Sequence, residues 1–485
     1  MEVNMATRNS AMKLNALDPQ SIERIHHAAL RVLEETGVQV LSKEGQKIMK
    51  EGGCEVHDND IVTIPSKVVE KALKSAPESI TLYDRYGNEE CILEGWNNFY
   101  GTGSDCPFIY DRKSGERRNC TYNDIADGAK VIDYLENFNF IMPIGIISDR
   151  PTHIADVYEV DACLSNTRKP VVFTAHDRET YRASIDLAAL IVGGMKKLQE
   201  KPIIGLYTEP ISPLRHTPEV TDKLIVSAEL GIPVVFTPCP LMGATAPATK
   251  AGIVVQSSAE CLSGLVVNQL VNPGSPVIFG GVINSFDMAT TIDPYGSPEL
   301  RLLCAAMTDM AHYYKLPMFG TAGCSDSKMI DSQTGSESGM SILISTLNGQ
   351  NLIHDIGYLD SGLLTSYDHF VLANELIAQA KFIAKGINVN DDTLAVAEID
   401  KVANKTNYIE SDFTYQFFRE EFYFPKLAER NNFVNWEEKG KLSQDKIISQ
   451  KVDHILETYT PDPLPQGVVK EMKKVLEGIG AKKTA

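Results

Sequence analysis

The sequence lacks the long apolar runs and the metal-ligand motifs that mark several large classes of protein. No apolar run is long enough to cross a bilayer, and the first residues hold no apolar signal core, so we expect a cytoplasmic protein. The nine cysteines are scattered without a CxxC pair, which is typical of reduced thiols. HExxH and His-x-His are also absent, and we predict no metal site.

Basic residues and tryptophan are scarce as well. The 46 lysines and arginines are outnumbered by 64 acidic residues, and the net charge of −18 argues against nucleic acid and anionic membranes as partners. Only two tryptophans are available for the stacking that is common around sugars, which disfavours a glycosidase that would use Glu209 and Asp326 as its carboxylates. No glycine-rich dinucleotide fingerprint follows the first strand-like run, which disfavours an open doubly wound sheet.

A repeated pattern of short apolar runs is the main positive signal. Eight such runs, most of them ending in polar, aromatic or glycine residues, lie at 97–105, 140–148, 170–177, 202–210, 232–240, 276–284, 316–328 and 351–360. They begin about 36 residues apart on average, which is enough for a strand, a helix and two loops. Eight βα units over about 250 residues are typical of a TIM barrel. We therefore predict an α/β fold, a (β/α)8 barrel over 96–388.

The segments on either side of the barrel are predicted from helix and turn signals. An N-terminal α+β cap over 1–95 would hold helices at 19–37, 42–52 and 65–76 and a hairpin at 80–93. Inside the barrel, Thr217 and Ser297 each precede Pro-Glu, which is a helix start signal. A C-terminal helical segment would span 389–485. Its aromatic stretch 406–440 is predicted to pack on the barrel wall, with a contact to a partner protein through 413–436 as the alternative.

Barrel active sites lie at the C-terminal strand ends, so the residues there are the candidates for chemistry. Zinc could use His176, Cys239, Cys324 and His354, but their spacing matches no zinc motif. Cys239 and Cys324 could be thiol nucleophiles, although buried cysteines are more often inert. Lys328 lies beyond its strand, which disfavours a Schiff base. Aromatic residues are the most conspicuous group at the predicted strand ends. Aromatic rings around a polar centre suit a quaternary ammonium held by cation–π attraction.

Six motifs in order make the chain similar to a known family. They are YGTGSD (100–105), TPCPLMGATAPAT (237–249), PYGSPEL (294–300), GTAGCSDSK (320–328), HDIGYLDSG (354–362) and FFREEFYFPKLAERNNFVNW (417–436). The chain resembles the trimethylamine methyltransferase superfamily, in its branch without pyrrolysine, over nearly its whole length. The resemblance implies a TIM barrel that moves a methyl group from a methylated amine to the cob(I)alamin of a separate corrinoid protein.

The substrates that this branch implies are quaternary amines such as glycine betaine, proline betaine, carnitine or γ-butyrobetaine. The chain contains only standard residues, which argues against trimethylamine itself. A quaternary nitrogen leaves as a neutral amine and needs no general acid, so orientation and exclusion of water suffice. The chain also lacks the DxHxxG pattern of corrinoid-binding domains, so cobalamin would arrive on a partner, and we expect a homo-oligomer. A metal- or corrinoid-dependent lyase or hydrolase, or a betaine-binding protein without turnover, remain alternatives.

The candidate site residues follow from these positions, and none is assigned a catalytic step. The substrate-binding candidates are Tyr100, Asp105, Tyr207, Glu209, Phe236, Asn284, Tyr295, His354 and Tyr358. The candidates that face the corrinoid are Gly323, Ser325, Asp326 and Lys328. Strand alternation places His354, Ile356 and Tyr358 on one side and Asp355 on the other. On that basis His354 would bind a substrate carboxylate, while Tyr100, Tyr207 and Tyr358 would hold the cation.

Overall fold

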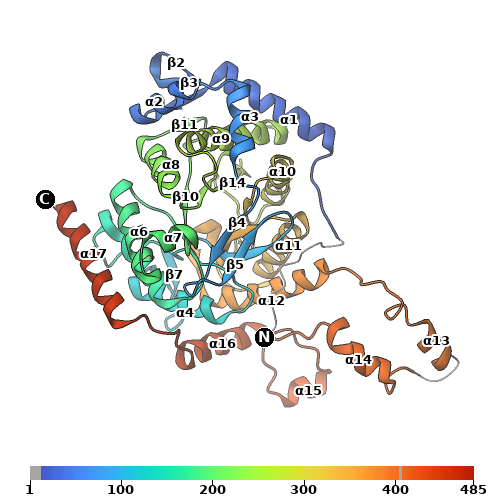
Figure 1. Cartoon of the computed structure of the whole chain (residues 1–485). Helices are drawn as coiled ribbons and strands as arrows, with labels where there is room; N and C mark the ends of the chain where they lie inside the picture. The colour runs from blue at the N-terminus through green and yellow to red at the C-terminus, as the bar shows by residue number, and fades with distance from the viewer. Residues whose placement is uncertain (1–11, 404–406, 485) are drawn as a thin grey trace.

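Seven parallel strands form the centre of the computed structural model, which describes residues 12–403 and 407–484. Their order in the sheet is β6-β17-β16-β14-β12-β10-β9, so β9 to β17 follow one another in chain order and the first strand, β6, lies beside the last, β17, as a barrel requires (Figure 1). The strands are β6 (Phe99–Thr102), β9 (Val171–Phe173), β10 (Ile204–Thr208), β12 (Val234–Phe236), β14 (Val277–Gly280), β16 (Met318–Thr321) and β17 (Leu352–Ile356).

The eighth position of the barrel is filled by the predicted run at 140–148, although that run is too irregular to form a strand. Phe140 makes a parallel bridge to Gly101 of β6, and Ile141 makes one to Val171 of β9. The backbone N–H of Ile141 donates to Pro170 O at 3.0 Å, and the N–H of Val172 donates to Ile141 O at 2.9 Å. These contacts join the two edge strands, and the predicted (β/α)8 barrel is confirmed.

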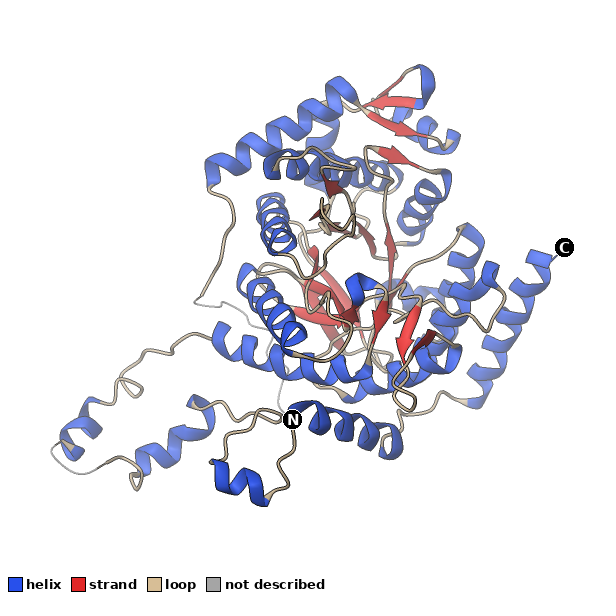
Figure 2. Cartoon of the chain, turned by 180° about the vertical axis from the view of Figure 1, so that it is seen from behind, coloured by secondary structure: helices blue, strands red, loops and turns tan. Residues whose placement is uncertain are grey.

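Helices surround the barrel, with one after each strand position and a second, α7, between α6 and β10 (Figure 2). The predicted start signals are confirmed: Thr217 Oγ1 accepts the N–H of Val220, and Ser297 Oγ accepts the N–H of Leu300, with proline at the first helical position in each case. The wall helices are α4 (Tyr122–Tyr134), α5 (Ala155–Asn166), α6 (Arg178–Val192), α7 (Met195–Glu200), α8 (Pro218–Leu230), α9 (Lys250–Val271), α10 (Pro298–Tyr314), α11 (Ser332–Asn348) and α12 (Tyr367–Ala384).

The N-terminal elements cover one side and the bottom of the barrel. Helix α1 (Pro19–Arg31) continues as a π-helical turn (Val32–Thr36) up to Gly37, whose φ of 74° only glycine adopts easily. The hairpin predicted at 80–93 is present, and its apolar side chains pack among those inside the barrel. The other elements are α2 (Lys43–Glu51), α3 (Ser66–Ser75), β1 (Val38–Val40), β2 (Glu55–Val56), β3 (Ile61–Thr63), β4 (Ile80–Tyr83) and β5 (Glu89–Leu93).

Short strands from the loops cover the opposite end, where the barrel strands terminate. They form two small sheets, with the orders β18-β19-β7-β8 and β13-β15. Strand β11 (Arg215–His216) instead pairs with β1 of the N-terminal region. The strands over the barrel end are β7 (Phe108–Tyr110), β8 (Arg117–Asn119), β13 (Leu241–Met242), β15 (Asn284–Ser285), β18 (Tyr358–Leu359) and β19 (Leu364–Thr365).

The C-terminal region departs from the prediction in one respect. Helices α16 (Gln444–Thr458) and α17 (Gln466–Thr484) pack on the wall, but α13 (Val396–Val402), α14 (Asp412–Glu421) and α15 (Phe433–Glu438) hold no buried residue. The expectation that 406–440 packs its aromatics on the barrel wall is confirmed for Tyr423, whose ring centroid lies 5.5 Å from that of Phe382 on α12, and is wrong for α14 and α15. Its helices extend sideways beyond the barrel (Figures 1 and 2). None of the described helices is both long and apolar enough to span a membrane.

Candidate functional site

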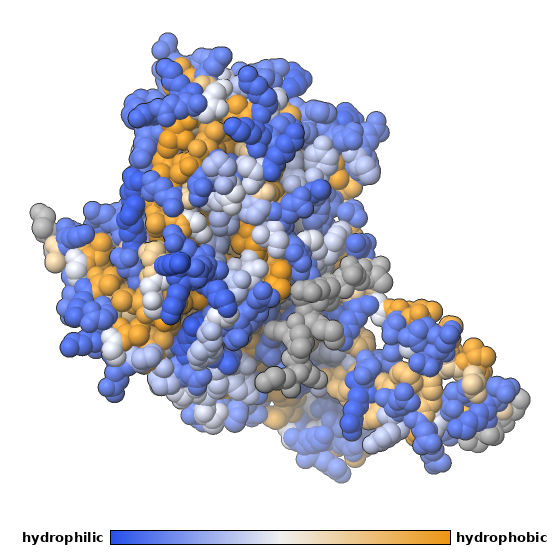
Figure 3. All heavy atoms as spheres, in the orientation of Figure 1, coloured by the Kyte–Doolittle hydropathy of each residue, from blue (hydrophilic) through white to orange (hydrophobic). Residues whose placement is uncertain are grey.

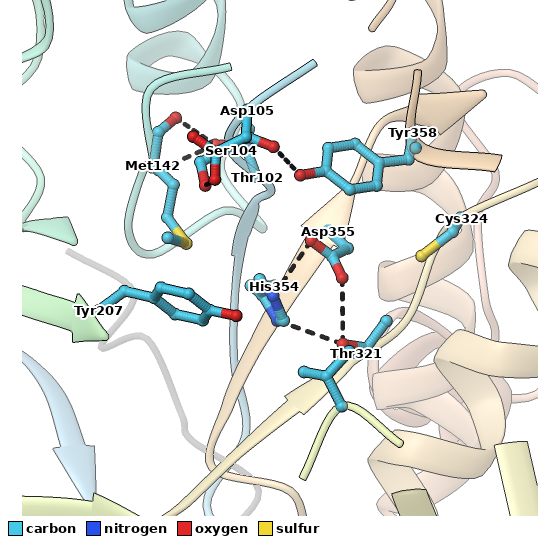
Figure 4. A network of polar contacts seen from close by, with 12 residues as sticks. Thr102, Ser104, Asp105, Met142, Tyr207, Thr321, Cys324, His354, Asp355 and Tyr358 are labelled. Atoms are coloured by element: carbon cyan, nitrogen blue, oxygen red, sulfur yellow. Dashed lines mark hydrogen bonds and ion pairs between the residues drawn. The ribbon is translucent and has the colours of Figure 1, made fainter. Parts of the chain in front are cut away.

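The C-terminal ends of β6, β10, β16 and β17 bring a set of polar and aromatic side chains together (Figure 4). Thr321 Oγ1 donates to Asp355 Oδ2 at 3.0 Å, and His354 Nε2 lies 3.1 Å from Asp355 Oδ1. The rings of Tyr207 and His354 have centroids 6.1 Å apart. Tyr358 reaches back from the loop after β17 and donates its hydroxyl to Ser104 O. These contacts define one site at the mouth of the barrel.

A bulge in β17 shapes this site and breaks the alternation predicted for the strand. Asp355 has a φ of 67°, and the register between β17 and β6 shifts between Ile353 and Ile356. Ile356 consequently packs in the layer between barrel and helices, while Asp355 joins His354 at the mouth. The prediction that Ile356 shares a side with His354, and that Asp355 lies on the other side, is wrong because of this bulge.

His354 and Asp355 form a buried pair in which both groups are uncharged. Burial lowers the pKa of His354 to about 3, and the Nδ1–H of the neutral ring donates to Gly320 O at 2.8 Å. Nε2 is then an acceptor, so the Asp355 oxygen beside it must carry a proton. Burial raises the pKa of Asp355 to about 8, helped by the charges of Asp105 and Asp293, which agrees with that assignment. His354 thus has no free donor for a substrate carboxylate.

The mouth is rich in acids, and several of them face the same space. Asp105 follows β6 with a φ of 70°, and its carboxylate, which lies in the mouth among protein atoms, accepts the Ser104 hydroxyl at 2.9 Å. Burial raises the pKa of Asp105, and the negative charge of Glu209 adds to this effect. The pKa of Asp293 is raised to about 6, mainly by burial. Lys223, a basic group near Glu209, points its Nζ to Ala175 O at 2.9 Å instead. The mouth therefore favours a cation.

Three tyrosines supply aromatic surface beside these acids. Tyr207, at the end of β10, is half-buried and donates its hydroxyl to Glu209 Oε2 at 2.9 Å, with Cys239 Sγ at 3.4 Å. Tyr295 and Tyr358 pack edge-to-face with ring centroids 5.7 Å apart. Burial holds the pKa of both hydroxyls well above the usual range. All three rings stay neutral and suit cation–π contacts.

Two predicted aromatic residues lie elsewhere. Tyr100 is fully buried between the barrel and its helices, where its hydroxyl lies 2.8 Å from Thr346 Oγ1 of α11. Phe236 also points outward and stacks on His216, with centroids 5.4 Å apart. A side chain on the outer face of a barrel strand cannot reach the mouth, so the assignment of Tyr100 and Phe236 to the substrate is corrected. Asn284 holds the loop that carries Tyr295, because its Nδ2 donates to Pro294 O at 3.0 Å.

The loop after β16 carries the residues predicted to face a corrinoid, and it is tied to its neighbours. Ser325 Oγ donates to Glu337 Oε2 at 2.6 Å, and Ser361 Oγ donates to Asp326 Oδ1 at 2.9 Å. Lys328 is exposed and lies 3.3 Å from Asp360. Gly323 has a φ of 71° and donates its N–H to Ser341 Oγ at 2.9 Å. The four residues therefore form a rigid rim beside the mouth, and their role toward a corrinoid stays a prediction.

Sequence reasoning missed four residues of the site: Gly103, Asp293, Thr321 and Asp355. Asp293 directly precedes the motif PYGSPEL and Thr321 lies inside GTAGCSDSK, so both could have been found from their positions near strand ends. The part played by Asp355 depends on the bulge, which has no sequence signal of its own. The structure groups no three His, Cys, Asp or Glu side chains in a metal-binding arrangement anywhere in 12–403 or 407–484.

Comparisons with known proteins identify the family to which the chain belongs. The model of the family described as trimethylamine methyltransferase (MTTB) matches residues 2–479. The trimethylamine methyltransferase MttB of Desulfitobacterium hafniense is 31% identical over 465 residues, which cover 96% of this chain and 94% of that protein. A glycine betaine methyltransferase from Desulfitobacterium hafniense is 29% identical over 456 residues, covering 93% and 94%.

Among solved structures, the monomethylamine methyltransferase MtmB of Methanosarcina barkeri is similar over 92% of this chain and 95% of its own, with 12% identity and a TM-score of 0.47. The family assignment rests on the sequence matches, which span nearly the whole chain. The chain belongs to the trimethylamine methyltransferase family, as the six motifs predicted, and its activity is that of a methyltransferase.

Proposed function

We propose that this member of the trimethylamine methyltransferase family transfers a methyl group from a quaternary amine of the betaine class to the corrinoid of a separate protein. The observation that carries the proposal is the mouth itself, where the rings of Tyr207, Tyr295 and Tyr358 lie near the acids Asp105, Glu209 and Asp293. Aromatic faces attract a cation without forming a bond to it, and nearby carboxylates add to the attraction. The betaine class is favoured because the chain contains no pyrrolysine and is similar to a glycine betaine methyltransferase.

The residues of the mouth would bind and orient the substrate rather than react with it. A corrinoid bound to its own protein supplies a nucleophilic cobalt that can accept a methyl group. In such a transfer the methyl–nitrogen bond would break and its electron pair would stay on nitrogen, so the leaving amine would be neutral and would take no proton from the chain. Tyr207 and the Tyr295–Tyr358 pair would fix the ammonium so that one methyl faces out of the barrel. The uncharged pair His354–Asp355 fits this role, since no acid or base is required.

Binding measurements with a neutral copy of the substrate test this proposal. We expect calorimetry to give an affinity for glycine betaine about ten- to thirtyfold higher than for 3,3-dimethylbutanoate, in which carbon replaces the nitrogen, because one or two desolvated cation–π contacts contribute about 1.5–2 kcal/mol. Equal affinities for the two compounds would refute the cation site. Tighter binding of tetramethylammonium or choline than of any betaine would refute the assignment of the substrate to the betaine class. It would still agree with a cation site.

The pair His354–Asp355 predicts that substrate binding depends on pH. Asp355 holds a proton below its pKa of about 8, and a quaternary cation nearby favours its ionised form. Binding should therefore release a proton, and the affinity should rise with pH up to about 8, by at most about tenfold per unit, and level off above it. Calorimetry in buffers of different ionisation enthalpy measures the proton release.

Asp355→Asn is the matched control for this pH dependence, because asparagine adopts the positive φ of this position and cannot ionise. This variant should bind the substrate with an affinity that stays flat between pH 6 and 9. A wild-type affinity without pH dependence, or an unchanged slope in the variant, would show that Asp355 does not sense the bound cation.

A further inference from the structure

A projecting segment, residues 385–403 and 407–440, exposes apolar side chains that the rest of the chain leaves uncovered. We call this segment the arm. Twelve of the 24 exposed large hydrophobic residues of the described chain belong to it, among them Ile409 at 81%, Tyr415 at 73% and Phe422 at 61% exposure. Figure 3 shows these apolar side chains gathered at the lower right, over the arm. Exposed apolar surface on this scale marks an interaction site.

The arm contacts the barrel wall at Tyr423 and Lys426, between α14 and α15, while its helices α13 to α15 hold no buried residue. Tyr423 donates its hydroxyl to Glu375 Oε1 at 2.8 Å, and the N–H of Lys426 donates to Glu375 Oε2 at 3.1 Å, both on α12. The only internal packing of α14 is between aromatic rings such as Phe413 and Phe417, 4.5 Å apart. The helices α13 to α15 have no core of their own, so a second surface is required to bury their apolar faces.

An apolar groove on the same chain offers such a surface. It lies between α1, α9 and α10, has a volume of about 510 Å³, and is lined by residues such as Ala28, Val254, Val255 and Leu302. Arg24 and Lys250 lie at the same groove, whereas 388–440 contains eleven acidic and six basic residues. Charge and apolar character are thus complementary between the arm and the groove. In Figure 1 the helices α1, α9 and α10 lie in the upper part of the molecule and α13 to α15 at the lower right, so the arm does not cover the groove of its own chain.

From this complementarity we infer that the arm docks into the α1–α9–α10 groove of a second copy of this chain. A contact between two different patches is heterologous and closes into a ring when the rotation between copies permits. The corrinoid protein is the other candidate occupant of the arm. The sideways direction of the arm favours a neighbour beside the barrel over a partner at its mouth. The inference holds whichever substrate the mouth takes.

The molecular mass of the full chain in sedimentation velocity tests this inference without any substrate. The wild type should sediment as a multiple of the 53.4 kDa chain. The double variant Tyr415→Asp with Phe422→Asp, on the arm, and the single variant Leu302→Asp, in the groove, should each weaken association about a hundredfold or more and sediment as monomers. Met340→Asp is the matched control, because Met340 is exposed at 57% on α11 and belongs to neither surface. It should keep the wild-type mass.

Three results would overturn the inference. A monomeric wild type that binds the corrinoid protein through Tyr415 and Phe422 would assign the arm to that partner. An unchanged mass in the arm variant would exclude the arm from the interface. A monomeric arm variant together with an unchanged Leu302→Asp mass would exclude the groove. Thermal melting of each variant, compared with that of Met340→Asp, separates loss of association from loss of the fold.

Discussion

Replacing Tyr207 by alanine is expected to lower kcat/KM for the quaternary amine by about 30- to 100-fold. Its ring lies at the end of β10, half-buried, beside Phe319 with centroids 5.6 Å apart and beside His354. A desolvated cation–π contact contributes about 2 kcal/mol, and the loss of a well-packed ring adds to this. The effect should fall mainly on substrate binding if the ring holds the ammonium in both the ground state and the transition state.

Tyr207→Phe is the control that separates the ring from its hydroxyl. Phenylalanine keeps the aromatic face and loses only the hydrogen bond to Glu209 Oε2. We expect kcat/KM within about fivefold of the wild type, because one partly solvated hydrogen bond contributes about 0.5–1 kcal/mol. If both variants lose activity equally, the hydroxyl is the important group and the cation wall must lie elsewhere. Steady-state kinetics with the saturating methyl acceptor give both values.

Gly103→Ala is expected to disrupt the mouth without touching the substrate. A Cβ at this position would lie 2.4 Å from Cε1 of Tyr358 and 2.6 Å from Oδ1 of Asp355, and both neighbours are buried. Relief of the clash requires the Tyr358 ring and the bulge at Asp355 to move. We expect the free energy of unfolding to fall by about 1–3 kcal/mol and the substrate affinity by about tenfold or more.

Gly335→Ala serves as the matched control for Gly103→Ala. Gly335 lies in α11, and no atom approaches within 4 Å of the added Cβ. Alanine is the better helix former, so this variant should be as stable as the wild type or more stable by up to about 1 kcal/mol. Denaturant unfolding measures both stabilities. A Gly103→Ala variant as stable and as active as Gly335→Ala would show that the mouth tolerates a shift of Tyr358.

The sequence predicted the barrel because strands and helix starts have strong local signals. Thr217 and Ser297 cap the helices that the Pro-Glu motif indicated, and the apolar runs became the strands, apart from the bridging segment around Phe140 and Ile141. Local signals do not tell which face of a strand a side chain occupies. Tyr100 and Phe236 were placed at the mouth from their positions near strand ends, yet both point outward.

Part of the site was predicted because positions at strand ends can be recognised in the sequence. Tyr207, Tyr295, Tyr358, Asp105 and Glu209 converge because parallel strands end together at the mouth. The bulge at Asp355 is a tertiary feature, and it changed the expected role of His354 from a donor toward substrate into one member of an uncharged pair. The exposed face of the arm also had no sequence signal. An aromatic helix has the same sequence pattern whether it packs on its own barrel or on another chain.

Methyl transfer to a corrinoid is the central claim, and one measurement tests it most directly. The purified chain is mixed with reduced corrinoid protein and glycine betaine, proline betaine or carnitine, and the absorbance change of cobalt methylation is followed while mass spectrometry counts the demethylated amine. The account predicts one demethylated amine for each methylated cobalt, with a rate that falls about 30- to 100-fold in Tyr207→Ala. Demethylated amine without cobalt methylation, or no turnover of any quaternary amine with a corrinoid protein that a related enzyme methylates, would contradict it.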